Sequence, residues 1–309
     1  MLPLIKYNHE TKNHYAIYNG KTIQSFDKRY VERRLRQVMA INSHHSSYTP
    51  LVEDAAVVEE KYGINVRFMF VEKLVNMVAS GVQCSAILTG EGGLGKSFTV
   101  LKALHNNGYT DVDNLIDSVV VEEDEESEPI DRSMTYLTVK GYSTAKGLYR
   151  TLYENRDNII IFDDCDSILR DPVAIMLLKG ALDSYGVRRI SWNADMKDDD
   201  LPRSFNFNGR VIFISNKRKN EIDQALRSRS MMIDLSMSTE QKIDRMEFIS
   251  KSEEFMPEFE EKHKHEALEF IREIKDECSD ISLRTLMAVT KIRSANKDWK
   301  ELATYMMTS

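Results

Sequence analysis

The sequence predicts an α/β fold in which helices cover both faces of a parallel sheet and a small all-α domain follows. Three observations predict it. The glycine-rich stretch GEGGLGKS, residues 90–97, joins an apolar strand-like segment to a helix-like segment. Strand-like and helix-like segments alternate as far as residue 236, a pattern that is typical of parallel sheets. Beyond residue 236 only helical patterns follow.

We expect three parts: a short N-terminal α+β segment at residues 1–50, a core at residues 51–236 and a helical domain at residues 237–309. In the first part, Asn19-Gly20 suits the positive φ angles of a type I′ turn and predicts a hairpin within YAIYNGKTIQSF. A basic helix in FDKRYVERRLRQVMAI and a polar linker in INSHHSSYTP are expected next. The role of this part stays open.

The core begins with a helical pattern at residues 51–80. The expected elements after it are strand 84–89, helix 98–104, strand 134–141, helix 143–155, strand 158–164, helix 169–186, strand 210–216 and strand 230–236. Residues 187–193 and 203–209 alternate in polarity and predict a hairpin inserted before strand 210–216. The four helical patterns of the last part lie at residues 238–252, 263–277, 282–293 and 298–307. Ser238 with Gln241 predicts a cap for the first of them.

Composition favours a globular protein: 42% of the 309 residues are hydrophobic and 29% are charged. No apolar run approaches the roughly 20 residues of a membrane span, and the first residues lack the apolar core of a secretory signal. Three cysteines without metal-like spacing favour a reducing compartment. We therefore expect a cytoplasmic protein without membrane association.

The net charge of −7 is concentrated in one run, EEDEESE at residues 122–128, which holds six acidic side chains. Such a run repels itself and predicts a solvated loop. Basic residues cluster elsewhere, at 28–36, 188–189 and 217–219. Contact with nucleic acid would therefore depend on local patches rather than on the charge of the whole molecule.

Gly90, Gly95, Lys96 and Ser97 fit G-x-x-x-x-G-K-[ST], the phosphate-binding loop or Walker A motif. Glycines let several backbone N–H groups turn into one hollow, and the N-terminus of the following helix adds partial positive charge. We expect a nucleoside triphosphate here, with Lys96 at its outer phosphates and the Ser97 hydroxyl on Mg²⁺. The residues expected to contact it are Gly90, Glu91, Gly92, Gly93, Leu94, Gly95, Lys96, Ser97 and Phe98.

Two carboxylates follow the most apolar run of the chain, residues 159–162, as in a Walker B motif. A buried parallel strand delivers its last side chains to the sheet edge where the phosphate-binding loop lies. Asp163 is then expected to bind Mg²⁺, and Asp164 to orient the attacking water or take its proton. Asp166 is the alternative for the second role.

Polar side chains also mark the last two strands. Asn216 ends strand 210–216, where its amide can bond the γ-phosphate and the water, although asparagine is also a common turn residue. Arg227 and Arg229 precede strand 230–236 and are not expected to reach the nucleotide of their own chain. An arginine supplied by a neighbouring molecule neutralises charge in the transition state. A solvated basic turn is the alternative.

Walker A, Walker B, the strand-end asparagine and the arginines, in this order, resemble the AAA+ ATPases over about residues 55–309. The resemblance implies ATP as ligand and a ring or partial ring, with a hexamer the expected size. In it Arg229, or else Arg227, completes the site of a neighbour. It also implies that residues 237–309 form a lid, in which Arg284 of SLRT touches the nucleotide. Most members have glutamate where this chain has Asp164, so slow hydrolysis is an open alternative.

Residues 162–192 and 201–216 are similar to poorly described ATPases of tailed phages, and the layout resembles the Holliday-junction branch-migration motor. The first expectation is a motor or loader acting on DNA in phage replication or recombination, in the host cytoplasm if a phage encodes it. The basic groups available for DNA phosphates are the N-terminal basic helix and Arg188, Arg189, Lys217, Arg218 and Lys219. The aromatic residues nearby are expected to pack rather than to stack on bases; they are Trp192, Phe205 and Phe207.

Two other functions stay open. A protein remodeller would use an aromatic pore loop, for which the short stretch Lys140-Gly141-Tyr142-Ser143 is the candidate. A nucleotide-gated scaffold would bind ATP, assemble and turn over slowly, as the shorter Asp164 side chain allows.

Overall fold

The computed structural model describes residues 5–8, 13–18, 21–25, 28, 31, 62–113, 134–184, 186–193, 201–278 and 280–308. The chain divides into two compact units, Met1–Lys61 and Tyr62–Ser309. Apart from Lys28 and Val31, the predicted basic helix and linker lie outside the described residues, as do the acidic run at 122–128 and the turn of the predicted second hairpin. Among the described helices, none is long and apolar enough to cross a membrane.

The first unit contains an antiparallel sheet of three strands in sequence order. They are β1 (Lys6–Asn8), β2 (Asn13–Tyr18) and β3 (Lys21–Ser25). Tyr18 pairs with Lys21, which confirms the hairpin predicted at this point. Its turn residues, Asn19 and Gly20, lie outside the described residues.

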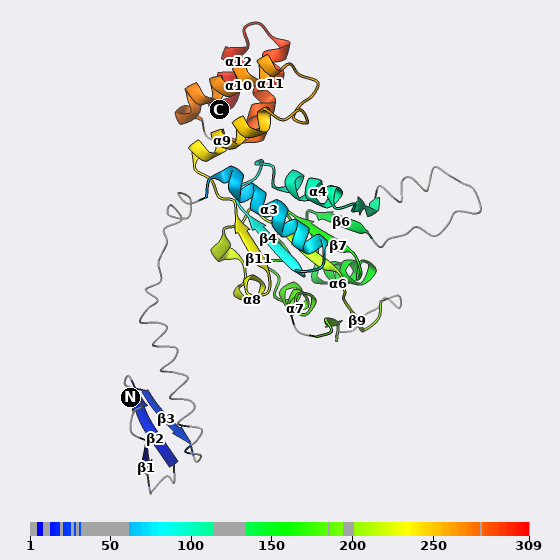
Figure 1. Cartoon of the computed structure of the whole chain (residues 1–309), viewed down its shortest axis with the longest axis vertical. Helices are drawn as coiled ribbons and strands as arrows, with labels where there is room; N and C mark the ends of the chain where they lie inside the picture. Colours follow the sequence, from blue (N-terminus) through cyan, green and yellow to red (C-terminus); the bar gives the residue numbers. More distant parts are fainter. Residues whose placement is uncertain are drawn as a thin grey trace, which may run out of the picture. The chain divides into compact units, whose positions relative to one another are not determined.

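The second unit is built on a parallel six-stranded sheet in the order β11-β4-β10-β7-β6-β5 (Figure 1). The strands are β4 (Ser85–Thr89), β5 (Thr110–Asp111), β6 (Thr135–Lys140), β7 (Ile159–Asp163), β10 (Arg210–Ile214) and β11 (Met231–Asp234). The α/β prediction is confirmed. The short edge strand β5 was not expected, because two residues carry no periodicity.

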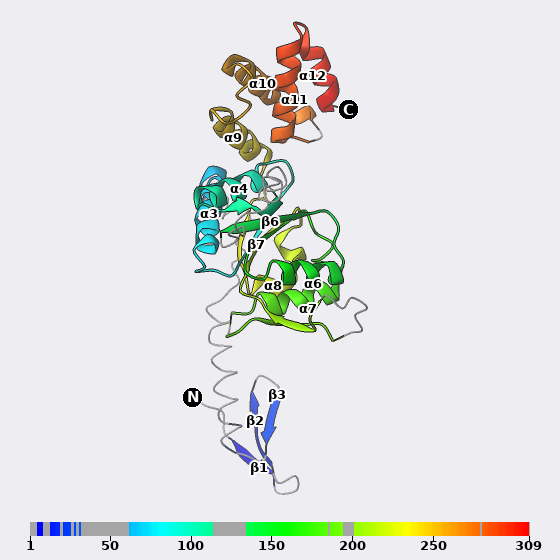
Figure 2. The same ribbon diagram turned by 90° about the vertical axis from the view of Figure 1, so that its right-hand side faces the viewer.

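Helices cover both faces of this sheet (Figures 1 and 2). One face packs against α3 (Ile64–Ala79) and α4 (Lys96–Asn106), and the other against α6 (Ala145–Glu154) and α7 (Pro172–Ala181). Successive side chains of a strand point to opposite faces, so Ile161 joins the first core and Phe162 the second. This double burial explains why β7 is apolar from Ile159 to Phe162.

The predicted second hairpin is confirmed by β8 (Arg189–Ser191) and β9 (Ser204–Asn206), which pair antiparallel. Phe205 and Phe207 are buried in the core beside α6 and α7, and the partly buried Trp192 packs against the same core, with its ring on Tyr149. The expectation that these aromatic residues pack is therefore confirmed.

Two of the basic residues considered for DNA contact face the protein itself. Lys217 is only 7% exposed, so the expectation that it is available to phosphates of DNA is wrong. The Arg188 guanidinium donates to the Ala181 carbonyl oxygen at 3.1 Å and lies over the Phe207 ring. Arg189 is exposed, although its guanidinium donates to the Ser204 hydroxyl at 2.8 Å.

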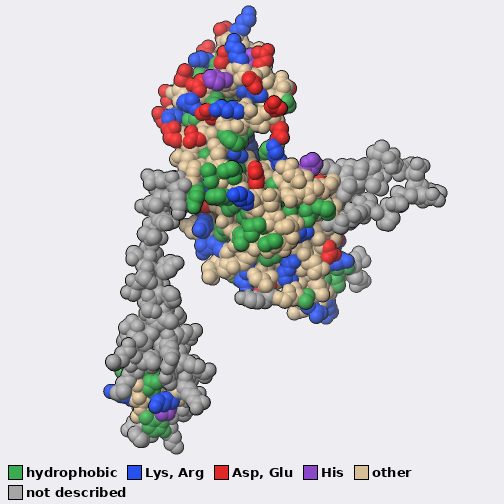
Figure 3. All heavy atoms as spheres, viewed as in Figure 1, with side chains coloured by type: hydrophobic (Ala, Val, Ile, Leu, Met, Phe, Trp, Pro, Cys, Tyr) green, Lys and Arg blue, Asp and Glu red, His purple; other side chains and the backbone are tan. Residues whose placement is uncertain are grey.

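The C-terminal part is helical, as predicted, and we call it the lid. Its helices are α9 (Thr239–Ser250), α10 (Glu261–Ile274), α11 (Leu283–Ala295) and α12 (Trp299–Thr308). They share one apolar core, and on the face seen in Figure 3 their surface is densely charged with both signs. The predicted cap is confirmed, because Ser238 and Gln241 form a reciprocal capping box. The short helices of the unit are η1 (Lys219–Glu221), α8 (Gln224–Arg227) and η2 (Lys275–Glu277).

The lid is anchored to the core through α3. The buried Arg67 guanidinium donates to the carbonyl oxygens of Asp234 and Ser236, and at 2.9 Å to the Gln241 side chain. A second arginine, Arg245 of α9, donates to Asn65 and lies 3.7 Å from the centre of the Phe68 ring. These contacts fix the start of α9 on the core.

Candidate nucleotide site

The glycine-rich loop lies between the end of β4 and the start of α4, as the motif predicts. Gly90, Gly93 and Gly95 have φ angles of 135°, 74° and 89°, a region that favours glycine. A Cβ on Gly90 would also lie 2.8 Å from the Leu235 carbonyl carbon. No side chain caps the N-terminus of α4, so the first N–H groups of this helix are available to an anion.

Lys96, only 5% exposed, is the centre of the loop. Its Nζ donates to the Gly90 and Glu91 carbonyl oxygens at 2.8 and 2.6 Å, and to Asn216 Oδ1 at 3.1 Å. Burial lowers the pKa of Lys96, while the charges of Asp164 and Asp163 oppose that shift. The lysine therefore links the loop to the end of β10.

Asp163 ends β7 directly beside the loop. The Ser97 hydroxyl donates to Asp163 Oδ1 at 3.0 Å, so two hard oxygen ligands of the kind that Mg²⁺ prefers are in contact. Among the described residues no group of three or more His, Cys, Asp or Glu could hold a metal ion. Mg²⁺ usually takes one or two carboxylates and completes its shell with water and phosphate oxygens.

Lys140 is a residue of this site that the sequence did not reveal as one. It ends β6, pairs in register with Asp163, and its Nζ lies 3.6 Å from Asp163 Oδ2. Its position at the end of a predicted strand was the available signal. The sequence does not show, however, that this strand lies beside β7.

Asp164 has a left-handed backbone with φ of 56°, which is uncommon for a residue other than glycine. Its backbone N–H donates to the Ile214 carbonyl oxygen, and its Oδ1 accepts a hydrogen bond of 2.7 Å from Asn216 Nδ2. Burial, and next the charge of Asp163, raise the pKa of Asp164. The alternative base, Asp166, accepts a hydrogen bond of 2.6 Å from the Ser215 hydroxyl.

The arginines before β11 lie at the other end of the sheet. The Ser85 hydroxyl, at the first residue of β4, donates to the Arg229 carbonyl oxygen at 3.2 Å. The loop follows the last residue of β4, about 13 Å away along the strand. Figures 1 and 2 accordingly show α8, which ends at Arg227, and the loop helix α4 at opposite ends of the sheet. The structure does not bring Arg227 or Arg229 to the loop of their own chain.

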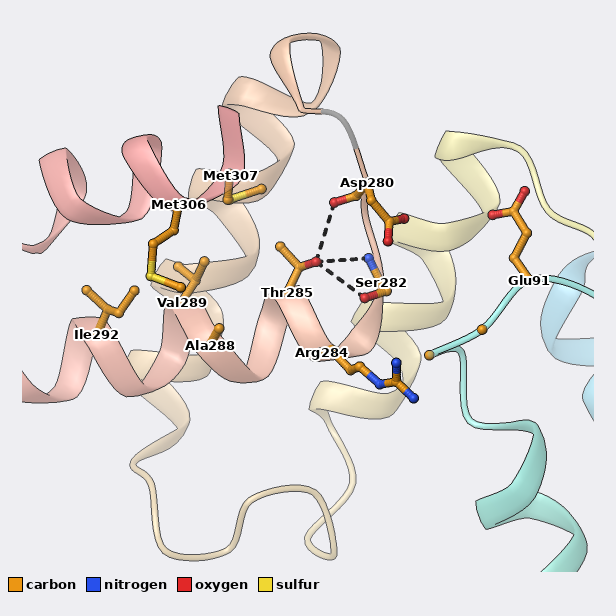
Figure 4. Close-up of a pocket in the computed structure, with 12 residues that line it drawn as sticks. Glu91, Asp280, Ser282, Arg284, Thr285, Ala288, Val289, Ile292, Met306 and Met307 are labelled. Carbon is orange, nitrogen blue, oxygen red and sulfur yellow. Dashed lines mark hydrogen bonds between the residues drawn. The ribbon is translucent and has the colours of Figure 1, made fainter. Parts of the chain in front are cut away.

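The lid closes over the loop from the other side. The Leu283 backbone N–H donates to the Gly93 carbonyl oxygen at 2.9 Å. Arg284 extends from α11 toward the loop (Figure 4) and lines, with Glu91 and Gly93, a cavity of about 630 Å³. Lys242 of α9 pairs with Glu91, with Nζ 2.5 Å from Oε2. Nothing in the sequence pointed to Lys242, because a lysine in the first turns of a helix usually faces water.

A second cavity, of about 400 Å³, lies on the other flank of the loop, between core and lid. Figure 3 shows hydrophobic side chains gathered around this boundary. Phe98 follows the loop directly and forms one wall, while Phe68 of α3 and Met287 of the lid form others. The walls of this second cavity are mainly apolar, whereas polar and apolar groups line the first cavity in more equal shares.

Comparison with known proteins gives a sequence relative and structural likenesses. No family model matches the chain. An uncharacterised 36.7 kDa protein from the nrdC–mobD intergenic region of Enterobacteria phage T4 is 27% identical over 263 residues, which cover 79% of this chain and 74% of the relative. The solved structure of C. elegans PCH-2 matches with a TM-score of 0.39 and 14% identity, over 83% of this chain and 70% of that one. The order of the strands and the position of the glycine-rich loop define the fold of this chain.

Proposed function

We propose that the chain is an AAA+ ATPase that binds Mg²⁺ and ATP at the glycine-rich loop and hydrolyses the nucleotide. One observation carries the proposal. The loop, β7 and β10, far apart in the sequence, converge in a single network in which Lys96 bonds Asn216 and Asn216 bonds Asp164. The Ser97–Asp163 hydrogen bond lies beside it. A lysine, a hydroxyl, two carboxylates and an amide at a helix N-terminus are the groups that phosphoryl transfer to water requires.

Each group has a defined task in this proposal. Lys96 and the loop N–H groups hold the phosphates, and Arg284 approaches them from the lid. Ser97 and Asp163 would hold Mg²⁺, which supplies charge neutralisation at the phosphate oxygens. Asn216 positions the attacking water, and Asp164 accepts its proton.

The surroundings of Asp164 favour it over Asp166 as the base. The raised pKa of Asp164 lies closer to neutral pH than that of an ordinary aspartate, which makes its carboxylate a stronger base. Asp166 is engaged by the Ser215 hydroxyl, which in turn accepts from the Lys217 N–H and so supports the end of β10. Asp166 therefore has a structural task already.

The second cavity is the proposed place for the base of the nucleotide. A purine needs an apolar slot of this size, and Phe98, Phe68 and Met287 provide flat and adaptable walls. Because this slot lies between core and lid, a bound base would hold both together.

The expected ring is part of the same proposal. Arg229 lies one strand length from the loop of its own chain, where it can serve only the loop of a neighbour. Both Arg227 and Arg229 are partly exposed, so part of each side chain faces solvent. We propose a ring or partial ring, most simply a hexamer, in which Arg229 completes the neighbouring site.

The substrate is proposed to be DNA in phage replication or recombination, supported by the similarity to a phage T4 protein and by the exposed Arg189, Arg218 and Lys219. The test is steady-state ATPase activity with single-stranded, double-stranded and branched DNA at two salt concentrations. Stimulation by one form that weakens with salt supports a DNA motor or loader. An ATPase rate that no form of DNA changes favours a protein remodeller. ATP-dependent assembly without measurable hydrolysis favours a nucleotide-gated scaffold.

The nucleotide site itself is tested with Lys96→Ala. This change removes the charge and the loop-shaping hydrogen bonds together, so ATP binding measured by calorimetry should be lost. Retained binding would overturn the proposed site.

A further inference from the structure

A lysine of the lid and a glutamate of the glycine-rich loop form an ion pair that no step above uses. Lys242 lies in α9 with its side chain 13% exposed, and its Nζ is 2.5 Å from Glu91 Oε2. Asp280, just before α11, places a second carboxylate 4.0 Å from the same Nζ. Figure 4 shows Glu91 rising from the loop and Asp280 from the lid, both at the rim of the cavity into which Arg284 extends.

Glu91 is an unfavourable residue for a loop that receives a triphosphate. Glu91 follows Gly90 directly, in a loop whose backbone N–H groups are suited to anions, and its side chain is 57% exposed. The charge of Glu91 acts on Lys96, as does that of Arg284, so all three belong to one local field. A bare carboxylate there would repel phosphate oxygens, and Lys242 is the cation that compensates it.

We propose that Lys242 is a phosphate-directed cation of the nucleotide site, supplied by the lid and paired with Glu91 until triphosphate oxygens compete for its ammonium group. This inference rests on the proposed function. Partner exchange requires no large movement, because the lid already contacts the loop through the Leu283–Gly93 hydrogen bond. Lys242 and Arg284 then approach the phosphates from two different lid helices, and lid closure becomes linked to nucleotide charge.

The alternative is a structural latch, in which the ion pair merely holds the lid on the loop. The two roles predict opposite signs for one substitution. A latch loses its strength when either partner is removed, so both single variants would bind nucleotide more weakly. In partner exchange, removal of Glu91 frees Lys242 for phosphate and strengthens binding.

The experiment measures the affinity of the full chain for a fluorescent, non-hydrolysable ATP analogue with Mg²⁺. Lys242→Met should weaken binding about tenfold, the size expected for loss of a charge-assisted contact. Glu91→Gln should tighten it about threefold, since the released cation is partly exposed. The double variant should lie between the two. Lys251→Met, which removes the exposed Lys251–Glu247 pair within the lid, is the matched control and should not change affinity.

Three results would overturn the inference: weaker or unchanged binding in Glu91→Gln, unchanged binding in Lys242→Met, or equal losses in both single variants. If Lys242→Met does not fold, the sign of the Glu91→Gln effect decides alone. Failure of the proposed function would look different, because wild type would then bind no better than Lys96→Ala.

Discussion

The two ends of the six-stranded sheet carry different sets of polar side chains. At the carboxyl ends, Lys96, Asn216 and Asp164 satisfy one another in a closed network within a single chain. At the amino ends, the Arg229 guanidinium donates to the Ala225 carbonyl oxygen, and the buried Nε atoms of Arg227 and Arg229 have no partner in the described part of the chain. The first end brings together the groups of the proposed site, whereas the second carries two arginines that lie far from that site in their own chain.

The largest expected effect is at the carboxyl ends. Asp164→Asn should keep nucleotide binding but lower turnover about 10³-fold, because the proton acceptor is lost. In wild type, turnover should fall as the pH falls through a pKa above the ordinary aspartate value of 3.8, since the carboxylate is the active form. A pH–rate profile for both proteins checks this. Turnover near the wild-type level in Asp164→Asn would move the role to another residue.

The amino ends are tested by Arg229→Ala, which should spare binding and lower turnover by about 10³-fold or less. Mixing it with Asp164→Asn sharpens the comparison, because random assembly pairs an intact loop with an intact arginine at about one quarter of interfaces. Activity that appears only on mixing supports a site shared between neighbours. Arg227→Ala is the matched control, and two inactive proteins that stay inactive together would contradict the shared site.

The network is tested through Asn216→Ala, for which we expect turnover lower by about 10²-fold, since the water loses an orienting group and Lys96 loses a partner. Single-turnover kinetics separates this loss from weaker binding. A pure change in the dissociation constant would reduce Asn216 to a support for Lys96.

The loop backbone is tested by stability. Gly90→Ala should lower the free energy of unfolding by about 3 kcal/mol, because the new Cβ meets the Leu235 carbonyl at a φ angle of 135°. Gly141→Ala is the control: its φ is 87°, but no atom lies within 4 Å, so about 1 kcal/mol is expected. Urea unfolding measures both, and equal losses would show that strain alone, not the close approach, matters.

The smallest effect concerns Cys165, which lies between Asp164 and Asp166. Burial, and then the surrounding carboxylates, raise its pKa to about 11. At pH 8 the thiol should therefore react with alkylating reagents at least tenfold more slowly than the more exposed Cys84. Mass spectrometry of timed labelling compares the two, and rapid modification of Cys165 would show that this part of the site opens.

Much of this architecture could be predicted from the sequence, because the signals are local. The glycine spacing predicts the phosphate-binding loop, and the apolar run before Asp163 predicts a buried strand. The position of Lys140 beside Asp163 and the pairing of Lys242 with Glu91 could not be predicted, since both depend on how distant segments pack. Lys217 was misjudged for the same reason: a basic cluster does not reveal which of its members the fold buries.

The Gln241 side-chain oxygen has two donors, the Ser238 N–H of the helix cap and the Arg67 guanidinium of α3. The same side chain therefore caps α9 and attaches it to the core. Loss of the Gln241 side chain would thus remove its half of the capping box of α9 and one of the attachments of this helix to α3 at the same time. A single substitution at this position would both fray the first helix of the lid and loosen its hold on the core.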